Sequence, residues 1–193
     1  MIKSRDQAWE LVKKYNQSES LRRHALAVEG TMRALSERFP GSNPDEWGMA
    51  GLLHDLDYEM YPDQHCHKAA ELLQAEGYDA TLIRAVMSHG FGIVTDVRPE
   101  TDLEKVLYTI DELTGLVTAA ALMRPSRSVL DLELKSLKKK YKTPSFAAGV
   151  DRSIIETGAG MLGWTLDDVL ESTIQAMRTV AAEIGLDGSA AIT

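Results

Sequence analysis

Apolar residues recur along most of the chain at the three- and four-residue steps that mark amphipathic helices. One clear stretch runs from Ser18 to Phe39, and another begins at Thr101 and ends at Pro125. The positions that share one face are Leu21, Ala25, Val28, Met32, Leu35 and Phe39 in the first stretch, and Leu103, Leu107, Ile110, Thr114, Val117 and Ala121 in the second, all apolar except Thr114. Such spacing places these residues on one buried helix face. Because no strand-like alternation accompanies it, the pattern predicts an all-α protein.

Turn and cap residues divide the rest of the chain into shorter predicted helices. Pro40-Gly41-Ser42 ends the first long helix, and Asn43-Pro44 supplies an N-cap and a first-turn proline for a helix to about residue 56. Residues 57–64 are predicted to form a loop, and further helices are expected near 65–76, 80–89, 128–140, 146–162 and 165–185. No repeat or composition shift marks a second domain. We expect one domain over 1–193, with C-terminal helices at 128–185 packing on a core at about 20–120.

Composition narrows the classes of function that this chain can have. The net charge is −8, and no apolar run approaches the ~20 residues of a transmembrane helix. We therefore expect neither a nucleic-acid polymer nor a membrane as a partner. The single cysteine, Cys66, excludes an internal disulfide and fits a reducing compartment. The residues after Met1 lack the apolar core of a signal peptide, so the sequence predicts a cytoplasmic protein.

Several titratable side chains fall on or beside the apolar helix faces. They are His24, His54, Asp55, His89 and Asp111, and all five histidines lie between His24 and His89. His24 follows Leu21 by three residues and precedes Val28 by four, which turns it inward. A single inward histidine is usually a hydrogen-bonded core residue. Several of them together with carboxylates are costly to bury, and a divalent metal that binds histidine and aspartate would compensate that cost.

The order and local sequence of these residues resemble the H…HD…D signature of the HD-domain superfamily of metal-dependent phosphohydrolases. The matching segments are Arg23-His24, Leu52-Leu53-His54-Asp55 and Ile110-Asp111-Glu112-Leu113. His65-Cys66-His67-Lys68-Ala69-Ala70-Glu71 resembles the start of the helix after the HD pair, with Cys66 in place of the usual proline. Ser88-His89-Gly90 is similar to the later histidine of members that bind two metals, many of which have paired histidines there. The resemblance spans about residues 20–120.

The resemblance implies an all-α HD fold and a divalent transition metal (Mn, Fe, Co, Ni or Zn), with Mg as a further candidate. One ion would be bound by four residues, His24, His54, Asp55 and Asp111. With His65 and His89 added, the set is similar to the six-ligand pattern of binuclear members, in which Asp55 bridges two ions. His67 lies two residues from His65, and both can bind only if this segment is not helical; the family register favours His65. The sequence leaves open whether one ion or two are bound.

The resemblance also implies an activity. A bound metal lowers the pKa of water, which predicts hydrolysis of a small phosphate ester, such as a nucleotide. Asp55 and Asp57 are the predicted catalytic residues, Asp55 as a metal ligand and Asp57, with Glu59, as a proton relay; loop solvation or helix capping also explains the two loop carboxylates. Arg23 and Lys68 are predicted to bind the substrate phosphate, with a solvated surface charge as the alternative for each.

Two other classes of function fit the same residues. Some HD-fold proteins with six such ligands hold two irons and use dioxygen, as in myo-inositol oxygenase-like enzymes. The other class is a non-catalytic helical module whose metal site is structural or vestigial. A lysine-rich segment at residues 135–142 suggests nucleic-acid or phosphate binding, but in so acidic a chain a solvated helix face is the better explanation.

Overall fold

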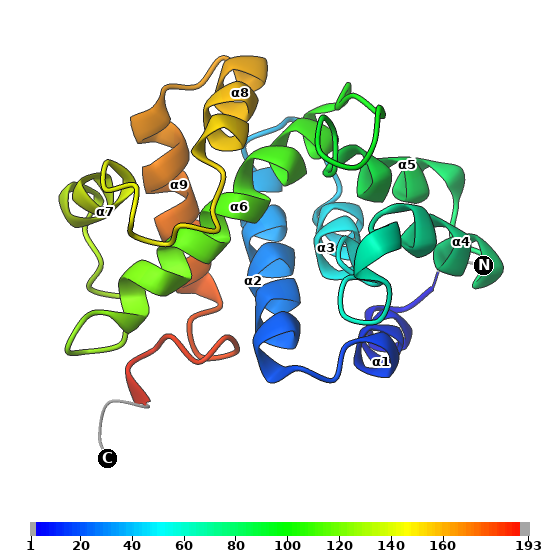
Figure 1. The fold of residues 1–193 in the computed structure, drawn as a ribbon, viewed down its shortest axis with the longest axis horizontal. Helices are drawn as coiled ribbons and strands as arrows, with labels where there is room; N and C mark the ends of the chain where they lie inside the picture. The colour runs from blue at the N-terminus through cyan, green and yellow to red at the C-terminus, as the bar shows by residue number, and fades with distance from the viewer. Residues whose placement is uncertain (1–2, 190–193) are drawn as a thin grey trace.

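The computed structural model describes residues 3–189, which form helices packed around two long central ones (Figure 1). Within these residues there are nine α-helices and one short 3-10 helix, and apart from isolated bridges no strand forms. The helices are α1 (Arg5–Tyr15), α2 (Glu19–Ser36), α3 (Pro44–Leu53), η1 (Pro62–Gln64), α4 (His67–Ala75), α5 (Ala80–Ser88), α6 (Asp102–Leu122), α7 (Leu134–Tyr141), α8 (Arg152–Leu162) and α9 (Leu166–Thr179). The predicted all-α fold is confirmed.

Local signals in the sequence set several helix starts. Thr101 and Glu104 form the predicted capping box at α6, and Asn43 caps α3 with its side chain. The first helix, α1, is absent from the set predicted from the sequence. A capping box between Ser4 and Gln7 begins this helix, so the sequence contains a local signal for its start.

Other helices differ from their predicted lengths. α4 begins at His67 rather than at residue 65, because Cys66 has a φ of 66°, a left-handed conformation that a right-handed helix cannot contain. α7 begins late because the chain before it pairs with the C-terminal segment, where the Val129 N–H donates to the Leu186 carbonyl. α8 and α9 are likewise shorter than the predicted 146–162 and 165–185.

The two long helices α2 and α6 divide the other helices into two groups. In Figure 1, α1, α3, α4 and α5 lie on one side of them and α7, α8 and α9 on the other. α2 packs on α3, α6 and α9, and α6 packs on α8. Separate apolar clusters fill the α6–α9 region, the contacts of α1 with α3 and α4, and the contacts of α2 with α3, α5 and α6. Over residues 3–189, no helix is both long and apolar enough to cross a membrane.

One glycine sets the distance between α2 and α3. A Cβ atom at Gly51 would lie 2.9 Å from the carbonyl oxygen of Val28 and 3.0 Å from the amide nitrogen of Glu29, both on α2. Real Cβ atoms are not found so close to backbone atoms, so the missing side chain lets the two helix backbones touch. This contact lies one turn before His54 and one turn after His24. The close approach of the helices therefore brings these two histidines together.

Candidate metal centre

Six titratable side chains from separate elements converge beside α2 and α6. They are His24 of α2, His54 and Asp55 directly after α3, His65 before α4, His89 directly after α5, and Asp111 of α6. The structure therefore brings together the whole ligand set predicted from the sequence. Within the described residues, groups of these side chains place one donor atom each within 4.8 Å of one another, close enough to hold a metal ion.

The first group of donors consists of His24, His54 and Asp111. The Nε2 atoms of the two histidines are 3.1 Å apart, and they lie 2.9 Å and 3.2 Å respectively from Asp111 Oδ1. Donors held 2.0–2.2 Å from an ion in tetrahedral or octahedral geometry are separated by roughly 2.8–3.6 Å. The spacing of this group fits a bound metal.

The second group consists of His65 and His89, whose Nε2 atoms are 3.2 Å apart. Both Nε2 atoms lie 3.5 Å from Asp55 Oδ1. The other oxygen of this carboxylate, Oδ2, lies 3.4 Å from His54 Nε2 and 3.7 Å from His24 Nε2. Asp55 thus stands between the two groups and presents one oxygen to each.

Hydrogen bonds on the far side of each ring orient the imidazoles. His54 Nδ1 lies 2.8 Å from the Gly51 carbonyl oxygen, and His89 Nδ1 lies 2.5 Å from the Val86 carbonyl oxygen. A carbonyl only accepts, so Nδ1 carries the proton in both rings and a neutral ring presents an unprotonated Nε2 to the centre. Two histidines that follow helix ends are fixed in this way by backbone groups of their own helices.

Thr114 orients the imidazole of His24. From the sequence, Thr114 was predicted only to lie on an apolar helix face. Its hydroxyl donates to the Asp111 carbonyl at 2.8 Å and lies 3.5 Å from His24 Nδ1, from which it can accept. The side chain is fully buried. Thr114 therefore links two donors of the first group from behind.

Asp57 does not lie where a proton relay to substrate would need it. It is fully buried; its Oδ1 accepts from His65 Nδ1 at 2.9 Å and its Oδ2 from the Ala69 amide at 2.7 Å. Burial lowers the pKa of His65, but the hydrogen bond to Asp57 opposes this, and the pKa rises to about 9. Asp57 is placed as a positioning residue behind a donor, and the loop that contains it is not solvated at this point.

The Glu59 carboxylate also accepts hydrogen bonds from the backbone. Its Oε2 accepts from the amides of Gln17 and Ser18, at 2.5 Å and 3.0 Å, just before α2. These bonds match the helix-capping alternative that the sequence left open for this carboxylate. They anchor the loop after the HD pair to the start of the helix that carries His24.

The charges of the centre interact strongly. Burial lowers the pKa of His54, but the Asp55 and Asp111 carboxylates outweigh it and raise that pKa to about 10. Burial also opposes ionisation of the two carboxyls, yet the charges and hydrogen bonds of the surrounding histidines, His54 foremost, together hold their pKa values below the usual range. The two carboxylates therefore need positive charge beside them, and protonated histidines or a metal cation can supply it.

Cys66 borders the second group. Its thiol is fully buried, and Sγ lies 3.9 Å from His89 Nδ1 and 3.8 Å from His89 Nε2. Burial raises the pKa of this thiol, but the charges and hydrogen bonds of His89 and His65 together outweigh burial, so the pKa falls to about 7. From the sequence, Cys66 was interpreted only as an indicator of compartment and as a departure from the family's usual proline.

The two predicted substrate cations lie in surface ion pairs. Arg23 pairs with Glu19 one turn earlier on α2, and Lys68 pairs with Glu71 at 2.7 Å on α4. Among the described residues, the recorded polar contacts of these two cations are with such surface groups and not with the metal-binding cluster. Substrate binding by either residue stays a prediction.

His67 lies outside the cluster, as the family register suggested. It is exposed, and its Nε2–H donates to the Val94 carbonyl at 3.1 Å. It lines a small surface hollow with residues 92–96.

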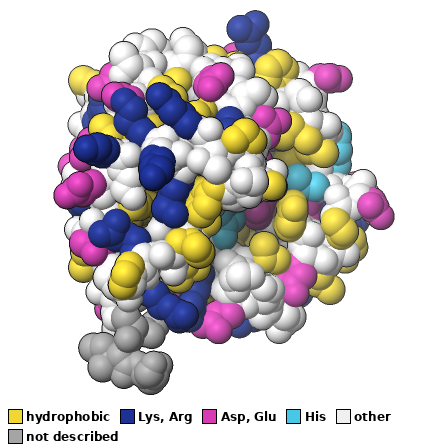
Figure 2. Space-filling model, turned by 60° about the vertical axis from the view of Figure 1, so that its left-hand side comes forward, with side chains coloured by type: hydrophobic (Ala, Val, Ile, Leu, Met, Phe, Trp, Pro, Cys, Tyr) yellow, Lys and Arg dark blue, Asp and Glu magenta, His cyan; other side chains and the backbone are white. Residues whose placement is uncertain are grey.

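The cluster is partly open to solvent. Figure 2 shows histidine side chains in a hollow of the surface, with hydrophobic side chains around them. Tyr58 is one of the aromatic side chains beside the cluster, because its ring centroid lies 5.1 Å from that of His65, and nearly half of the residue is exposed.

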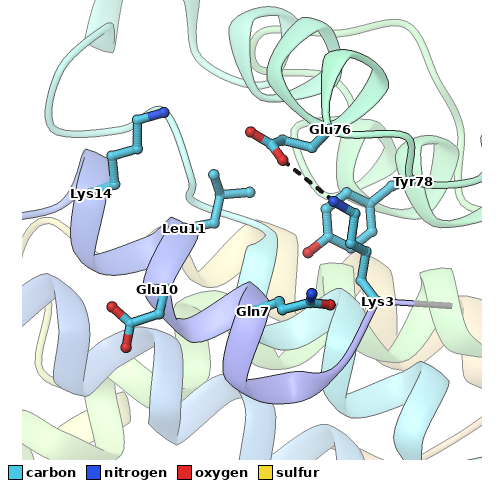
Figure 3. Close-up of a pocket in the computed structure, with 7 residues that line it drawn as sticks. All are labelled: Lys3, Gln7, Glu10, Leu11, Lys14, Glu76 and Tyr78. Atoms are coloured by element: carbon cyan, nitrogen blue, oxygen red, sulfur yellow. Dashed lines mark hydrogen bonds and ion pairs between the residues drawn. The ribbon is translucent and has the colours of Figure 1, made fainter. Parts of the chain in front are cut away.

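A different hollow of about 330 Å³ lies between α1 and the α4–α5 turn. Its lining includes none of the cluster residues, and two of its lining residues, Lys3 and Glu76, pair with each other (Figure 3).

Comparison with protein families identifies the class to which this fold and site belong. A family model described as HD domain matches residues 21–116, a range that includes the six converging residues. The chain therefore belongs to the HD-domain superfamily of metal-dependent hydrolases. α7, α8 and α9 lie beyond the matched range. A comparison with solved structures finds no match.

Proposed function

We propose that this protein is a metal-dependent phosphohydrolase that uses metal-activated water to cleave a small phosphate ester, such as a nucleotide. The observation that carries the proposal is the position of Asp55, which presents one carboxylate oxygen to His24 and His54 and the other to His65 and His89. A carboxylate shared between two groups of donors is typical of two-metal sites in phosphatases and nucleases.

The donor set divides naturally between two ions. His24, His54, Asp111 and Asp55 Oδ2 would hold one, and His65, His89 and Asp55 Oδ1 would hold the other. Bound divalent ions would lower the pKa of water and stabilise negative charge on a phosphoryl group. All the donors are nitrogen or carboxylate oxygen atoms, a set that suits Mn, Fe, Co, Ni or Zn better than Mg.

The protein's own contribution is to hold these donors in place. Gly51, Val86 and Thr114 accept hydrogen bonds from the far nitrogens of three imidazoles, and Asp57 accepts one from the fourth. Such partners fix the ring orientation and the protonated nitrogen. The rings therefore need little rearrangement when an ion binds.

Exposure within the centre indicates the side from which a substrate approaches. The side chains of His54 and His89 are almost fully buried, whereas those of His24 and Asp111 are about one fifth exposed. The side chains of His65 and Asp55 are 15% and 16% exposed, so the opening reaches both donor groups and exposes His24 and Asp111 most. A small phosphorylated molecule suits an opening of this kind, and the acidic chain argues against a nucleic-acid polymer.

The test begins with metal analysis of protein purified without added chelator. A panel of nucleotides, sugar phosphates and simple phosphomonoesters is then assayed with Mn, Co, Ni, Fe, Mg or Zn, and after removal of metal by a chelator. We expect phosphate release that stops on metal removal and returns on metal addition.

Two results would overturn the proposal. One is phosphate release that continues unchanged in demonstrably metal-free protein. The other is the absence of phosphate release across the panel by fully metal-loaded protein; if that protein instead holds iron and consumes oxygen, the oxygenase function is supported.

A further inference from the structure

His65, Cys66 and His89 form a cluster of metal-binding side chains that the nitrogen and carboxylate donors above do not account for. One donor atom from each of the three lies within 4.8 Å of the others. We propose that the Cys66 thiolate is a ligand of the second ion and makes this position selective for zinc-like metals over manganese and magnesium. The inference rests on the proposed two-metal centre and adds a ligand to it.

The distances fit this role. Cys66 Sγ lies 3.8 Å from His89 Nε2, the nitrogen that faces the second position. A tetrahedral ion with a sulfur ligand at about 2.3 Å and a nitrogen ligand at about 2.0–2.1 Å would separate the two atoms by about 3.6 Å. Only a small movement of the thiol is required.

The surrounding chain leaves space for the sulfur on the side of His89. A Cβ atom built on Gly90 would lie 2.7 Å from Cys66 Sγ. Any residue with a side chain at position 90 would therefore displace the thiol. Cys66 itself is fully buried, so the sulfur faces imidazole rings rather than solvent.

The chemistry of the added donor gives the selectivity. Binding exchanges the thiol proton for the ion, and the proton is released to solvent. The second position then has four protein donors, namely two imidazoles, one thiolate and one oxygen of Asp55. Thiolate is a soft ligand that favours Zn or Co and is a poor match for Mg or Mn.

Cobalt spectroscopy tests the ligand directly, without an activity assay. Metal-free wild-type protein is titrated with Co²⁺ under anaerobic conditions, in parallel with Cys66→Ser and Cys66→Ala. We expect wild type to develop a near-ultraviolet sulfur-to-cobalt charge-transfer band as the second equivalent binds. Both variants should lack this band and keep the visible cobalt bands of the first ion.

A competition experiment measures the selectivity. The affinity of the second position for Zn should fall by at least about tenfold in Cys66→Ser, since loss even of outer-shell partners costs 10–100-fold. Its affinity for Mn should change little. Circular dichroism of both variants checks that the helices remain.

The outcomes separate this inference from the function on which it rests. Two cobalt ions bound without a sulfur band in wild type, or equal Zn affinities in wild type and a folded Cys66 variant, would overturn the role of Cys66 and leave the metal centre standing. Failure of wild type to bind cobalt at all would overturn both.

Discussion

The two groups of donors around Asp55 are held in place by different means. His24 and Asp111 lie within the two long helices, and His54 directly follows α3, which touches α2 through Gly51. In the second group, His65 lies in a turn outside any helix and His89 at a helix end. Hydrogen bonds orient the imidazoles of both groups, but the first group is also fixed by the close packing of α3 on α2. The second group depends mainly on the hydrogen bonds that His65 donates to Asp57 and that His89 donates to the Val86 carbonyl. We therefore expect the first position to be robust and the second to respond to small local changes.

The largest effect is expected where the two groups share a residue. Asp55→Ala removes the carboxylate that faces both, so metal content should fall sharply at both positions. Phosphate release should fall at least about a thousandfold, because a metal contributes several kcal/mol of transition-state stabilisation. Elemental analysis and a phosphate assay measure this. Asp63→Ala, which changes an exposed aspartate in η1, is the matched control, and normal metal content in folded Asp55→Ala would contradict the account.

Removing one donor from each group should separate the two positions. His54→Ala should lower the metal content of the first position, and His89→Ala that of the second, since each removes a buried nitrogen donor. Stoichiometry measured by mass spectrometry of the native protein gives the readout. His67→Ala should leave it unchanged, because His67 faces Val94. If His67→Ala and His89→Ala lost the same amount of bound metal, the assignment of His89 but not His67 to the second group would be wrong.

Asp57→Asn tests whether hydrogen bonding holds the second group. The substitution keeps the size of a buried side chain but weakens the acceptor for His65 Nδ1. We expect the second ion to bind about 10–100-fold more weakly, as is typical when a partner behind a metal ligand is lost, while the first ion binds as before. Calorimetric metal titration separates the two affinities. If both ions bound equally more weakly, Asp57 would stabilise the fold in general rather than hold His65 in place.

The smallest expected effect is on the pH dependence of metal-free protein. The pKa of His54 is raised to about 10 and that of His65 to about 9, from 6.5. Groups with raised pKa values hold protons more tightly when folded. Their stabilisation is complete below pH 6.5 and is lost as the pH rises through the folded values. The Cys66 thiol, with its pKa lowered to about 7 from 9.0, acts in the opposite direction between pH 7 and 9.

The pKa of His89 is raised as well, because the Cys66 and Asp55 side chains together outweigh its burial. Three histidines against one thiol give a net loss, so the urea midpoint of metal-free protein should fall between pH 6.5 and 9. Cys66→Ser should steepen the fall. Saturating metal should reduce it, because the ions replace the protons. A midpoint of metal-free wild type that rises over this range would contradict the expected charge balance.

The first group was predictable from sequence because its residues sit on regular helices. The three- and four-residue spacing turns His24 inward, and the same periodicity places Asp111 beside Leu107. Both predictions needed only the helical period. The Gly51 contact that brings His24 and His54 together depends on tertiary packing, which no local pattern reports.

The second group was less accessible to such reasoning. His65 lies in a non-helical turn next to Cys66, whose φ of 66° no periodicity indicates, so only the family resemblance selected it. Asp57 was assigned a proton-relay role because it lies just past the HD pair, but its carboxylate is buried and accepts hydrogen bonds from His65 and from the Ala69 amide of α4. Thr114 was assigned to the core for its position in an apolar stripe. Its hydroxyl has a second role there that the stripe could not indicate.

Anomalous diffraction from crystals grown with Mn or Co can show whether Asp55 joins two metal positions. We expect two anomalous peaks about 3.5–4 Å apart. One should contact His24, His54 and Asp111, the other should contact His65 and His89, and Asp55 should lie between them. A single peak under saturating metal, or a second peak that does not contact His65 and His89, would contradict this role of Asp55.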